Sequence, residues 1–283
     1  MKSKITTIVI ALFFVIGIGF IAYPIVGAII SDFTSTKVIQ NYENQVKHMD
    51  YSTLNDSKKE FIDINKRLKK IVENPFMLMD KNKSKTTPVD KNKKVKEGEM
   101  LGFLSIPKID VMQPICEGTK EATLSHAIGH LIGTSMPYGG KSTHCCITGH
   151  SGLSYATMLT DLDKLYVGDV FYIKVLNETH EYKIDSKKIV KPYGADQYLK
   201  IEKGKDYVTL ATCYPVTVNT HRLLLRGHRI PYDGGLKDFY KNKIAETELQ
   251  VIILAIVALL IIGSVVTLYI LRKKRMLFFK RRF

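Results

Sequence analysis

Asp206-Tyr-Val-Thr-Leu-Ala-Thr-Cys-Tyr-Pro215 reads as one strand, and Arg222-Leu-Leu-Leu-Arg226 begins a second strand after a short polar turn. The first stretch alternates side chains that suit a pleated sheet, and Pro215 blocks further pairing in the ladder. Cys213 is therefore predicted at a strand end. If the two strands pair in antiparallel register, the guanidinium of Arg222 returns towards the thiol.

Two long apolar stretches lie outside this region of the 283-residue chain. Residues 5–30 are almost wholly apolar and exceed the roughly 20 residues needed to span a bilayer. We predict an N-terminal anchor or signal-anchor over residues 1–30. A cleaved signal peptide is the competing interpretation, but its apolar region is usually shorter. Residues 251–271 carry no charge and predict a second transmembrane helix.

Basic residues flank both stretches on their outer sides. Lys2 and Lys4 precede the first stretch, and a basic tail over residues 272–283 follows the second. The positive-inside rule then places both termini in the cytoplasm and the region between them outside the cell. These flanks and a Lys-rich linker account for much of the net charge of +15. Without an aromatic-interleaved basic motif, we do not expect nucleic-acid binding.

Residues 31–99 are predicted to be a helical extension that ends in the Lys-rich linker. Ser57-Lys-Lys-Glu60 is a capping-box pattern, and apolar residues at helical spacing run from Phe61 to Ile71. The helix is expected to stop before Asn74-Pro75, because a residue that precedes proline avoids helical backbone angles.

Residues 100–235 are predicted to form the folded domain, and residues 236–250 a connector to the second span. The pattern predicts strands at 102–107, 111–115 and 143–148, a hairpin of 170–175 with 180–184, and short helices at 122–129 and 157–165. Such a strand-rich, mostly antiparallel domain favours a β-barrel over a doubly wound sheet.

Cys213 is the best-placed candidate nucleophile, because a thiolate attacks acyl carbons and a strand end leaves it accessible. We interpret Cys116, Cys145 and Cys146 as small buried residues, although disulfides remain open. His150 follows a predicted strand between two glycines and suits proton transfer. On spacing alone, a structural role for Cys213 and Arg222 also remains open.

His126 and His130 lie four residues apart on a predicted helix, which is the spacing of a metal pair. The sequence offers no third ligand, so a surface or packing role is the preferred interpretation. His144, Cys145, Cys146 and His150 also lack a familiar zinc spacing. We therefore expect no metal site.

Thr209-Leu-Ala-Thr-Cys213, Arg222 nine residues later and Thr148-Gly-His150 upstream together resemble the signature of sortases, the membrane-anchored cysteine transpeptidases of Gram-positive bacteria. The stretches Gly129–Gly140 and His221–Arg229, the long N-terminal extension and the second apolar span resemble class C, the pilin-polymerising sortases. The likeness is dense over about residues 100 to 232.

This resemblance implies an eight-stranded sortase β-barrel with short helices, an N-terminal helical extension with a lid, and two flanking transmembrane helices. Cys213 would be the nucleophile, His150 the general acid and base, and Arg222 the electrostatic partner, with Thr212 in the substrate-binding groove.

The class C lid is usually an Asp-Pro-aromatic motif, and the matching position here is Asn74-Pro75-Phe76. Phe76 keeps the ring that would cover the cysteine. Asn74 lacks the carboxylate that would pair with Arg222, so either the lid is held more weakly or Asp80 substitutes for it.

The activity implied by the resemblance is cleavage of an LPXTG-like sorting signal between Thr and Gly, followed by an isopeptide bond from Thr to a pilin lysine amine. The expected partners are pilin subunits with sorting signals and acceptor lysines, and the membrane, with no cofactor. Three alternatives remain open: a housekeeping-type sortase, a hydrolytic cysteine peptidase at the cell surface, and a non-enzymatic membrane-tethered scaffold.

Overall fold

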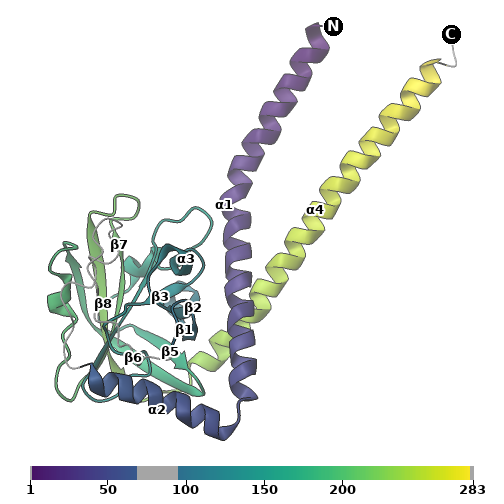
Figure 1. Cartoon of the computed structure of the whole chain (residues 1–283). Helices are drawn as coiled ribbons and strands as arrows, with labels where there is room; N and C mark the ends of the chain where they lie inside the picture. Colours follow the sequence, from purple (N-terminus) through teal and green to yellow (C-terminus); the bar gives the residue numbers. More distant parts are fainter. Residues whose placement is uncertain (1, 69–94, 281–283) are drawn as a thin grey trace.

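Eight strands close into a barrel within residues 2–68 and 95–280, which are the residues that the computed structural model describes. Their order around the barrel is β1-β2-β3-β4-β7-β8-β6-β5 (Figure 1). The strands are β1 Met100–Ile106, β2 Val111–Glu117, β3 Ile128–His130, β4 Thr143–Gly149, β5 Val170–Val175, β6 Glu178–Val190, β7 Asp206–Tyr214 and β8 His221–Ile230. The predicted eight-stranded barrel is confirmed.

Most neighbouring strands are antiparallel, but β4 and β7 are parallel, from the pair Thr143 and Asp206 to the pair Gly149 and Thr212. Both strands therefore end at the same end of the barrel, and β8 begins there because it is antiparallel to β7. We call this the Cys213 end and the opposite end the Asp206 end.

Alternation along β7 separates two apolar clusters. Val208 and Leu210 point into the barrel core, where they are fully buried. Ala211 points outwards and packs with Leu224 beneath the segment that joins β6 to β7. That segment contains a short 3-10 helix, Ala195–Tyr198, which packs over part of the outer face of β7 and β8. Because side chains alternate along a strand, Cys213 shares the outer face with Ala211.

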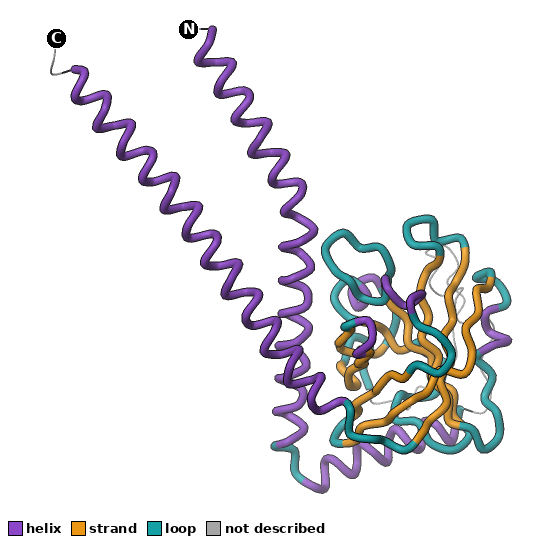
Figure 2. The backbone as a smooth tube through the Cα atoms, turned by 180° about the vertical axis from the view of Figure 1, so that it is seen from behind, coloured by secondary structure: helices purple, strands orange, loops and turns teal. Residues whose placement is uncertain are grey.

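Two long helices lie against the barrel, meet beside it and then extend away towards the same side while diverging (Figures 1 and 2). They are α1, Lys2–Lys47, and α4, Leu236–Lys280. Lys243 of α4 is 4% exposed and lies 2.6 Å from a carboxylate oxygen of Asp110 and 3.4 Å from one of Asp32. This buried cation joins α4 both to α1 and to the turn between β1 and β2. A buried charge that loses its partner is strongly destabilising. These ion pairs therefore hold α4 in a fixed position relative to α1 and to the β1–β2 turn.

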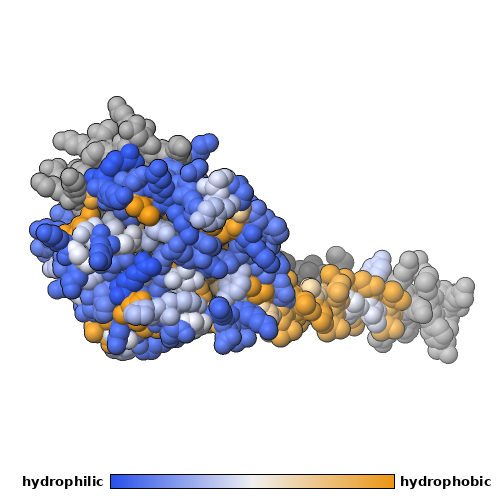
Figure 3. Space-filling model, turned by 90° about the horizontal axis from the view of Figure 1, so that it is seen from below, coloured by the Kyte–Doolittle hydropathy of each residue, from blue (hydrophilic) through white to orange (hydrophobic). Residues whose placement is uncertain are grey.

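Both helices have apolar segments that are long enough to cross a membrane. The candidate spans lie within Val15–Lys47 and Leu236–Leu271, and the most apolar 18-residue window of each has a mean hydropathy of 1.9 and 3.1, respectively. Their most apolar windows are not buried in the protein, and Figure 3 shows this apolar surface projecting from a hydrophilic barrel. The two helices indicate membrane association.

Helix α2, Tyr51–Arg67, crosses the Asp206 end of the barrel. Its predicted start at Ser57 was wrong, because Asp50 caps an earlier start by accepting a 2.9 Å hydrogen bond from the amide of Thr53. The predicted apolar face is confirmed by the burial of Phe61 and Ile64 in the core. Asn74, Pro75, Phe76 and Asp80 lie outside the described residues.

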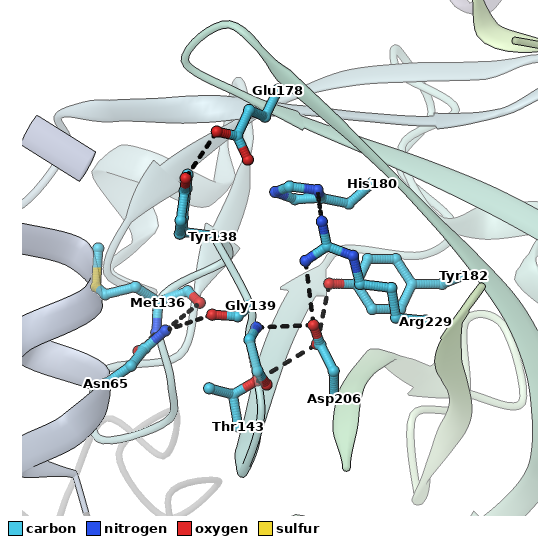
Figure 4. Close-up of polar contacts among 11 residues, drawn as sticks. Asn65, Met136, Tyr138, Gly139, Thr143, Glu178, His180, Tyr182, Asp206 and Arg229 are labelled. Atoms are coloured by element: carbon cyan, nitrogen blue, oxygen red, sulfur yellow. Dashed lines mark hydrogen bonds and ion pairs between the residues drawn. The ribbon is translucent and has the colours of Figure 1, made fainter. Parts of the chain in front are cut away.

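Polar side chains hold α2 in place (Figure 4). Asn65 accepts a 2.6 Å hydrogen bond from the amide of Met136 and donates to the carbonyls of Met136 and Gly139. Lys58 lies 2.7 Å from the carboxylate of Glu178, on the β5–β6 hairpin. The helix is therefore attached to the barrel by directional contacts as well as by its apolar face.

Three other predicted elements differ from the structure. The helix expected over 122–129 ends at Leu124 (α3, Glu121–Leu124), because residues 128–130 pair with β2 and β4 as strand β3. The helix expected over 157–165 is only a 3-10 turn, Thr160–Lys164. Strand β6 continues past residue 184 to Val190, because it pairs with β8 from Glu181 to Val190.

Candidate active site

The three predicted catalytic residues come together at the Cys213 end of the barrel. Cys213 pairs directly with Arg222 across β7 and β8. Residues that face each other on antiparallel strands point to the same side, with their Cβ atoms about 4.5–5.5 Å apart. Gly149, the last residue of β4, pairs with Thr212, so His150 follows at the level of Cys213. The arrangement depends on the pairing of three neighbouring strands, β4, β7 and β8.

Hydrogen bonds between loops and strands hold the histidine and the cysteine in register. The hydroxyl of Ser151 donates a 2.8 Å hydrogen bond to the carbonyl of Cys213. The hydroxyl of Thr212 donates a 2.9 Å bond to the carbonyl of Gly149. Together these bonds tie both neighbours of His150 to the end of β7, so the backbone on each side of the histidine is fixed.

Thr212 was predicted to bind substrate. Its side chain is buried, and its hydroxyl is engaged with the backbone of Gly149. This placement favours a role in positioning the residues around His150, and a substrate contact stays a prediction. Ser151 was not singled out from the sequence. Its only signal was its position directly after His150.

Charged and polar groups around the thiol are only partly satisfied by the protein. Arg222 donates from Nη1 to the backbone carbonyls of His221 and Asn219, at 3.0 and 3.3 Å. Nε2 of His150 lies 3.7 Å from a carboxylate oxygen of Glu121, beyond hydrogen-bond distance. Among the buried polar atoms of the described residues, Nε2 of His150 and Nε of Arg222 have no hydrogen-bond partner. Such unpaired groups are costly in a folded protein and are typical of functional sites.

Burial separates Cys213 from the other three cysteines. All four thiols are free, so the possible disulfides do not form. Cys116, Cys145 and Cys146 are at most 5% exposed, whereas Cys213 is half-buried. Burial raises the pKa of Cys116 to about 11 and also raises the pKa of Cys146. A raised pKa disfavours the thiolate, so these two buried thiols are poor nucleophiles.

The two histidines with metal-pair spacing do not share a helix face. His126 follows α3 and is exposed, whereas His130 is buried on β3. Nδ1 of His130 lies 2.8 Å from Glu117, and Nε2 lies 2.9 Å from the carbonyl of Ser135. His130 therefore packs between β2 and the β3–β4 connection. Within residues 2–68 and 95–280, no group of three or more metal-ligating side chains is present.

Two of the cavities among the described residues are lined by residues of β7 and β8 or of their ends. The larger, about 850 Å³, lies at the Asp206 end and is lined by Asn65, Tyr138 and Arg229 among others, so it is remote from Cys213. The smaller, about 230 Å³, is lined by Thr209 and Leu224, which lie on the outer face that carries Cys213. The chemistry therefore belongs to the outer face of β7 and β8 and not to the larger cavity.

Comparison with known proteins decides the family. The sortase domain model matches residues 104–230. The structure of sortase C-1 from Streptococcus pneumoniae is 40% identical, with a TM-score of 0.62, and the match covers 69% of this chain and 99% of that one. This chain belongs to the sortase family. The pilus-related sortase C of Group B Streptococcus is 39% identical, with a TM-score of 0.60 and coverage of 69% of this chain and 98% of that one.

Sortase A of Bacillus anthracis is 26% identical over 227 residues, which are 80% of this chain and 95% of that protein. Sortases are cysteine transpeptidases, and the structural neighbours of this sortase are pilin-related class C enzymes. The predicted enzyme class is thus confirmed. Membership of the sortase family also excludes the alternative of a non-enzymatic scaffold. The roles of individual side chains remain proposals.

Proposed function

We propose that this sortase cleaves an LPXTG-like sorting signal between Thr and Gly and joins the Thr to a pilin lysine amine. The observation that carries the proposal is the direct pairing of Cys213 with Arg222, with His150 at the end of the neighbouring strand. The pilus-related sortase C of Group B Streptococcus supports pilin as the substrate class.

In the first half of the proposed reaction, the sulfur of Cys213 attacks the carbonyl carbon of the Thr–Gly peptide bond. The cation of Arg222 favours the thiolate, because an opposite charge nearby stabilises the ionised form. The carbonyl oxygen becomes an oxyanion, which the same guanidinium stabilises. His150 then donates a proton to the nitrogen of the departing Gly as the C–N bond breaks. The products are a thioester on Cys213 and a free amino terminus.

In the second half, an uncharged lysine amine attacks the thioester carbon. His150, left neutral by the first half, accepts the proton that the amine loses. The C–S bond breaks, the thiolate of Cys213 is restored, and Thr is joined to the lysine side chain by an amide bond. The unpaired Nε2 of His150 is a nitrogen that is free to perform both transfers.

Arg222 has the geometry for its proposed role. Its Nη1 is held by two backbone carbonyls of the β7–β8 turn, which fixes the plane of the guanidinium. Its Nε has no partner among the described residues and is left for the substrate or oxyanion. A fixed cation costs little reorganisation when charge develops on the substrate.

The proposed enzyme works outside the cell, with both termini in the cytoplasm. The support is the basic flank beyond each apolar span, which the positive-inside rule places on the cytoplasmic side. We also propose that Asn74-Pro75-Phe76 acts as a lid and that Thr212 contributes to the substrate groove.

The decisive variant is Cys213→Ala. It should abolish the crosslinked pilin ladder in cells that carry an LPXTG-type pilin, and its circular dichroism spectrum should match that of the wild type. Cys116→Ala is the matched control, because that thiol is buried on β2, and it should retain the ladder. A ladder from the Cys213 variant would contradict the mechanism. A free threonine carboxylate as the main product, with acceptor lysine in excess, would favour the hydrolytic peptidase instead.

A further inference from the structure

Helix α1 runs along the whole side of the barrel, and its contacts fix its direction. The hydroxyl of Tyr42 donates to the carbonyl of Leu101 and accepts a 2.7 Å hydrogen bond from the amide of Leu176, in the β5–β6 hairpin. That hairpin lies at the Asp206 end, because β6 starts there beside the end of β8. The C-terminal part of α1 is therefore held at the end of the barrel away from Cys213.

Nearer its N-terminus, α1 meets the Cys213 end. A Cβ atom added at Gly27 would lie 2.8 Å from the Cβ of Tyr155, so the helix touches the loop that follows His150. Residues 15–25 of α1 are almost entirely exposed, whereas residues 26–29 are partly covered. The helix therefore leaves the barrel beside the catalytic loop, and Figure 1 shows α4 leaving towards the same side.

The point of exit lies inside the apolar stretch that is proposed to span the membrane. Gly27 is three residues inside residues 5–30, which is about 4–5 Å along a helix axis. Interfacial groups commonly lie about 5–10 Å into the boundary between headgroups and acyl chains. The loop at Tyr155 is thus at the depth where a bilayer surface would begin.

The loops at the Cys213 end suit such a surface. Residues 151–157 (Ser-Gly-Leu-Ser-Tyr-Ala-Thr) and 214–220 (Tyr-Pro-Val-Thr-Val-Asn-Thr) contain no Lys, Arg, Asp or Glu, although 24% of the chain is charged. The two loops touch each other, since a Cβ atom at Gly152 would lie 2.8 Å from Val216. Val218 is 62% exposed at the tip of the second loop. We call these two loops the apolar rim.

The opposite end of the barrel has the reverse character. The loop that enters β7, residues 200–206, reads Lys-Ile-Glu-Lys-Gly-Lys-Asp, and Lys203 in it is exposed. Figure 3 views the molecule from this side and shows a surface that is mostly hydrophilic. The apolar rim and the loop that enters β7 therefore differ in charge.

We propose that the apolar rim rests on the lipid surface, so that Cys213 opens towards the membrane. The proposal rests on the proposed membrane-spanning arrangement and adds which end of the barrel faces the bilayer. The partner is the headgroup and upper acyl region of a bilayer, because the rim meets the apolar stretch of α1 at Gly27 and contains no Lys, Arg, Asp or Glu. Tyrosine at its edge is a residue enriched at such interfaces.

The chain contains no tryptophan, which allows a direct test with the full-length protein in lipid nanodiscs. Val218→Trp places a single tryptophan on the apolar rim, and Lys203→Trp places one on the charged end as the matched control. Both positions are exposed, so neither substitution disturbs the core. Brominated lipids should reduce the emission of the Val218→Trp protein about twofold and leave that of the Lys203→Trp protein unchanged, because bromine quenches only at acyl depth.

Equal emission from the Val218→Trp protein in brominated and unmodified lipid overturns the proposal. Quenching at both positions also overturns it, because the barrel would then lie on its side. The readout does not involve catalysis. Quenching at position 218 in a protein that makes no crosslinks would overturn the proposed function and leave the orientation standing.

Discussion

His180 should make the folded sortase sensitive to acid. The residue is 1% exposed, and its ring lies edge-on to Tyr138, with centroids 5.6 Å apart. Arg229 donates a hydrogen bond to its Nδ1 (Figure 4). Burial and the neighbouring Arg229 cation lower the pKa of His180 to about 4. The native protein therefore holds this imidazole neutral at a pH where an unfolded chain would protonate it.

The size of the effect follows from the two pKa values. An unfolded histidine titrates near pH 6.5, so the unfolded state binds more protons than the native state between about pH 6.5 and 4. The native state loses stability as the pH falls through this window, and the loss is complete below the folded pKa. At about 1.4 kcal/mol per pKa unit, the cost is on the order of 3 kcal/mol. For a domain of this size, that corresponds to a fall in Tm of about 10 °C.

The comparison should use thermal unfolding of the full-length protein in detergent at pH 7, 5.5 and 4. His180→Gln keeps an acceptor for Arg229 and cannot titrate, so its Tm should fall by about 10 °C less than that of the wild type. His126→Gln is the matched control, because His126 is exposed, and it should follow the wild type. The carboxylates that titrate in this pH range are the same in all three proteins, so their contribution cancels when the changes in Tm are compared. Parallel pH curves for the wild type and the His180 variant would refute the reasoning.

Three further outcomes are expected. Thr212→Val removes the hydrogen bond to the carbonyl of Gly149. If Thr212 positions the backbone around His150, the variant should have a lower kcat for a sorting peptide and an unchanged KM. A raised KM would instead indicate that Thr212 contacts the substrate. Gly227→Ala should cost about 1–3 kcal/mol in urea unfolding, because its Cβ would lie 2.7 Å from Phe171, and an unchanged midpoint would contradict this packing. Phe76→Ala should increase cleavage of a soluble sorting peptide if the ring caps the groove, and unchanged or lower activity with an intact fold would indicate that the cluster only packs.

The strands around Cys213 were predictable because the information that forms them is local. Alternation along 206–214 and the short turn before Arg222 determine which residues pair, and the structure has that register. Strand β3 was missed because it has only three residues and is formed by its two neighbours. The start of α2 was missed because Ser57 and Asp50 both offer a capping side chain, and the helix uses the earlier one.

The partners of Cys213 were less accessible to sequence reasoning. His150 is brought level with Cys213 by the parallel pairing of β4 with β7, two strands separated by more than fifty residues of chain. No local pattern encodes such a pairing, so the histidine was assigned from its glycine neighbours and from the family resemblance. Cys213 was predicted as the nucleophile from its place at a strand end and from the family resemblance, and its greater exposure than the other three cysteines depends on the closed barrel.

The orientation of the barrel on the membrane lies furthest from the sequence. Charge beyond the apolar spans predicts which side of the membrane the domain occupies, but it says nothing about which end of the barrel faces the lipid. That depends on the direction of α1 relative to β7, which is set by Tyr42 at one end and by Gly27 against Tyr155 at the other. An extended peptide spans only about 3.3–3.6 Å per residue. With the proposed orientation, a membrane-tethered substrate needs few residues between the bilayer and its scissile bond, whereas the reverse orientation would require a linker longer than the barrel.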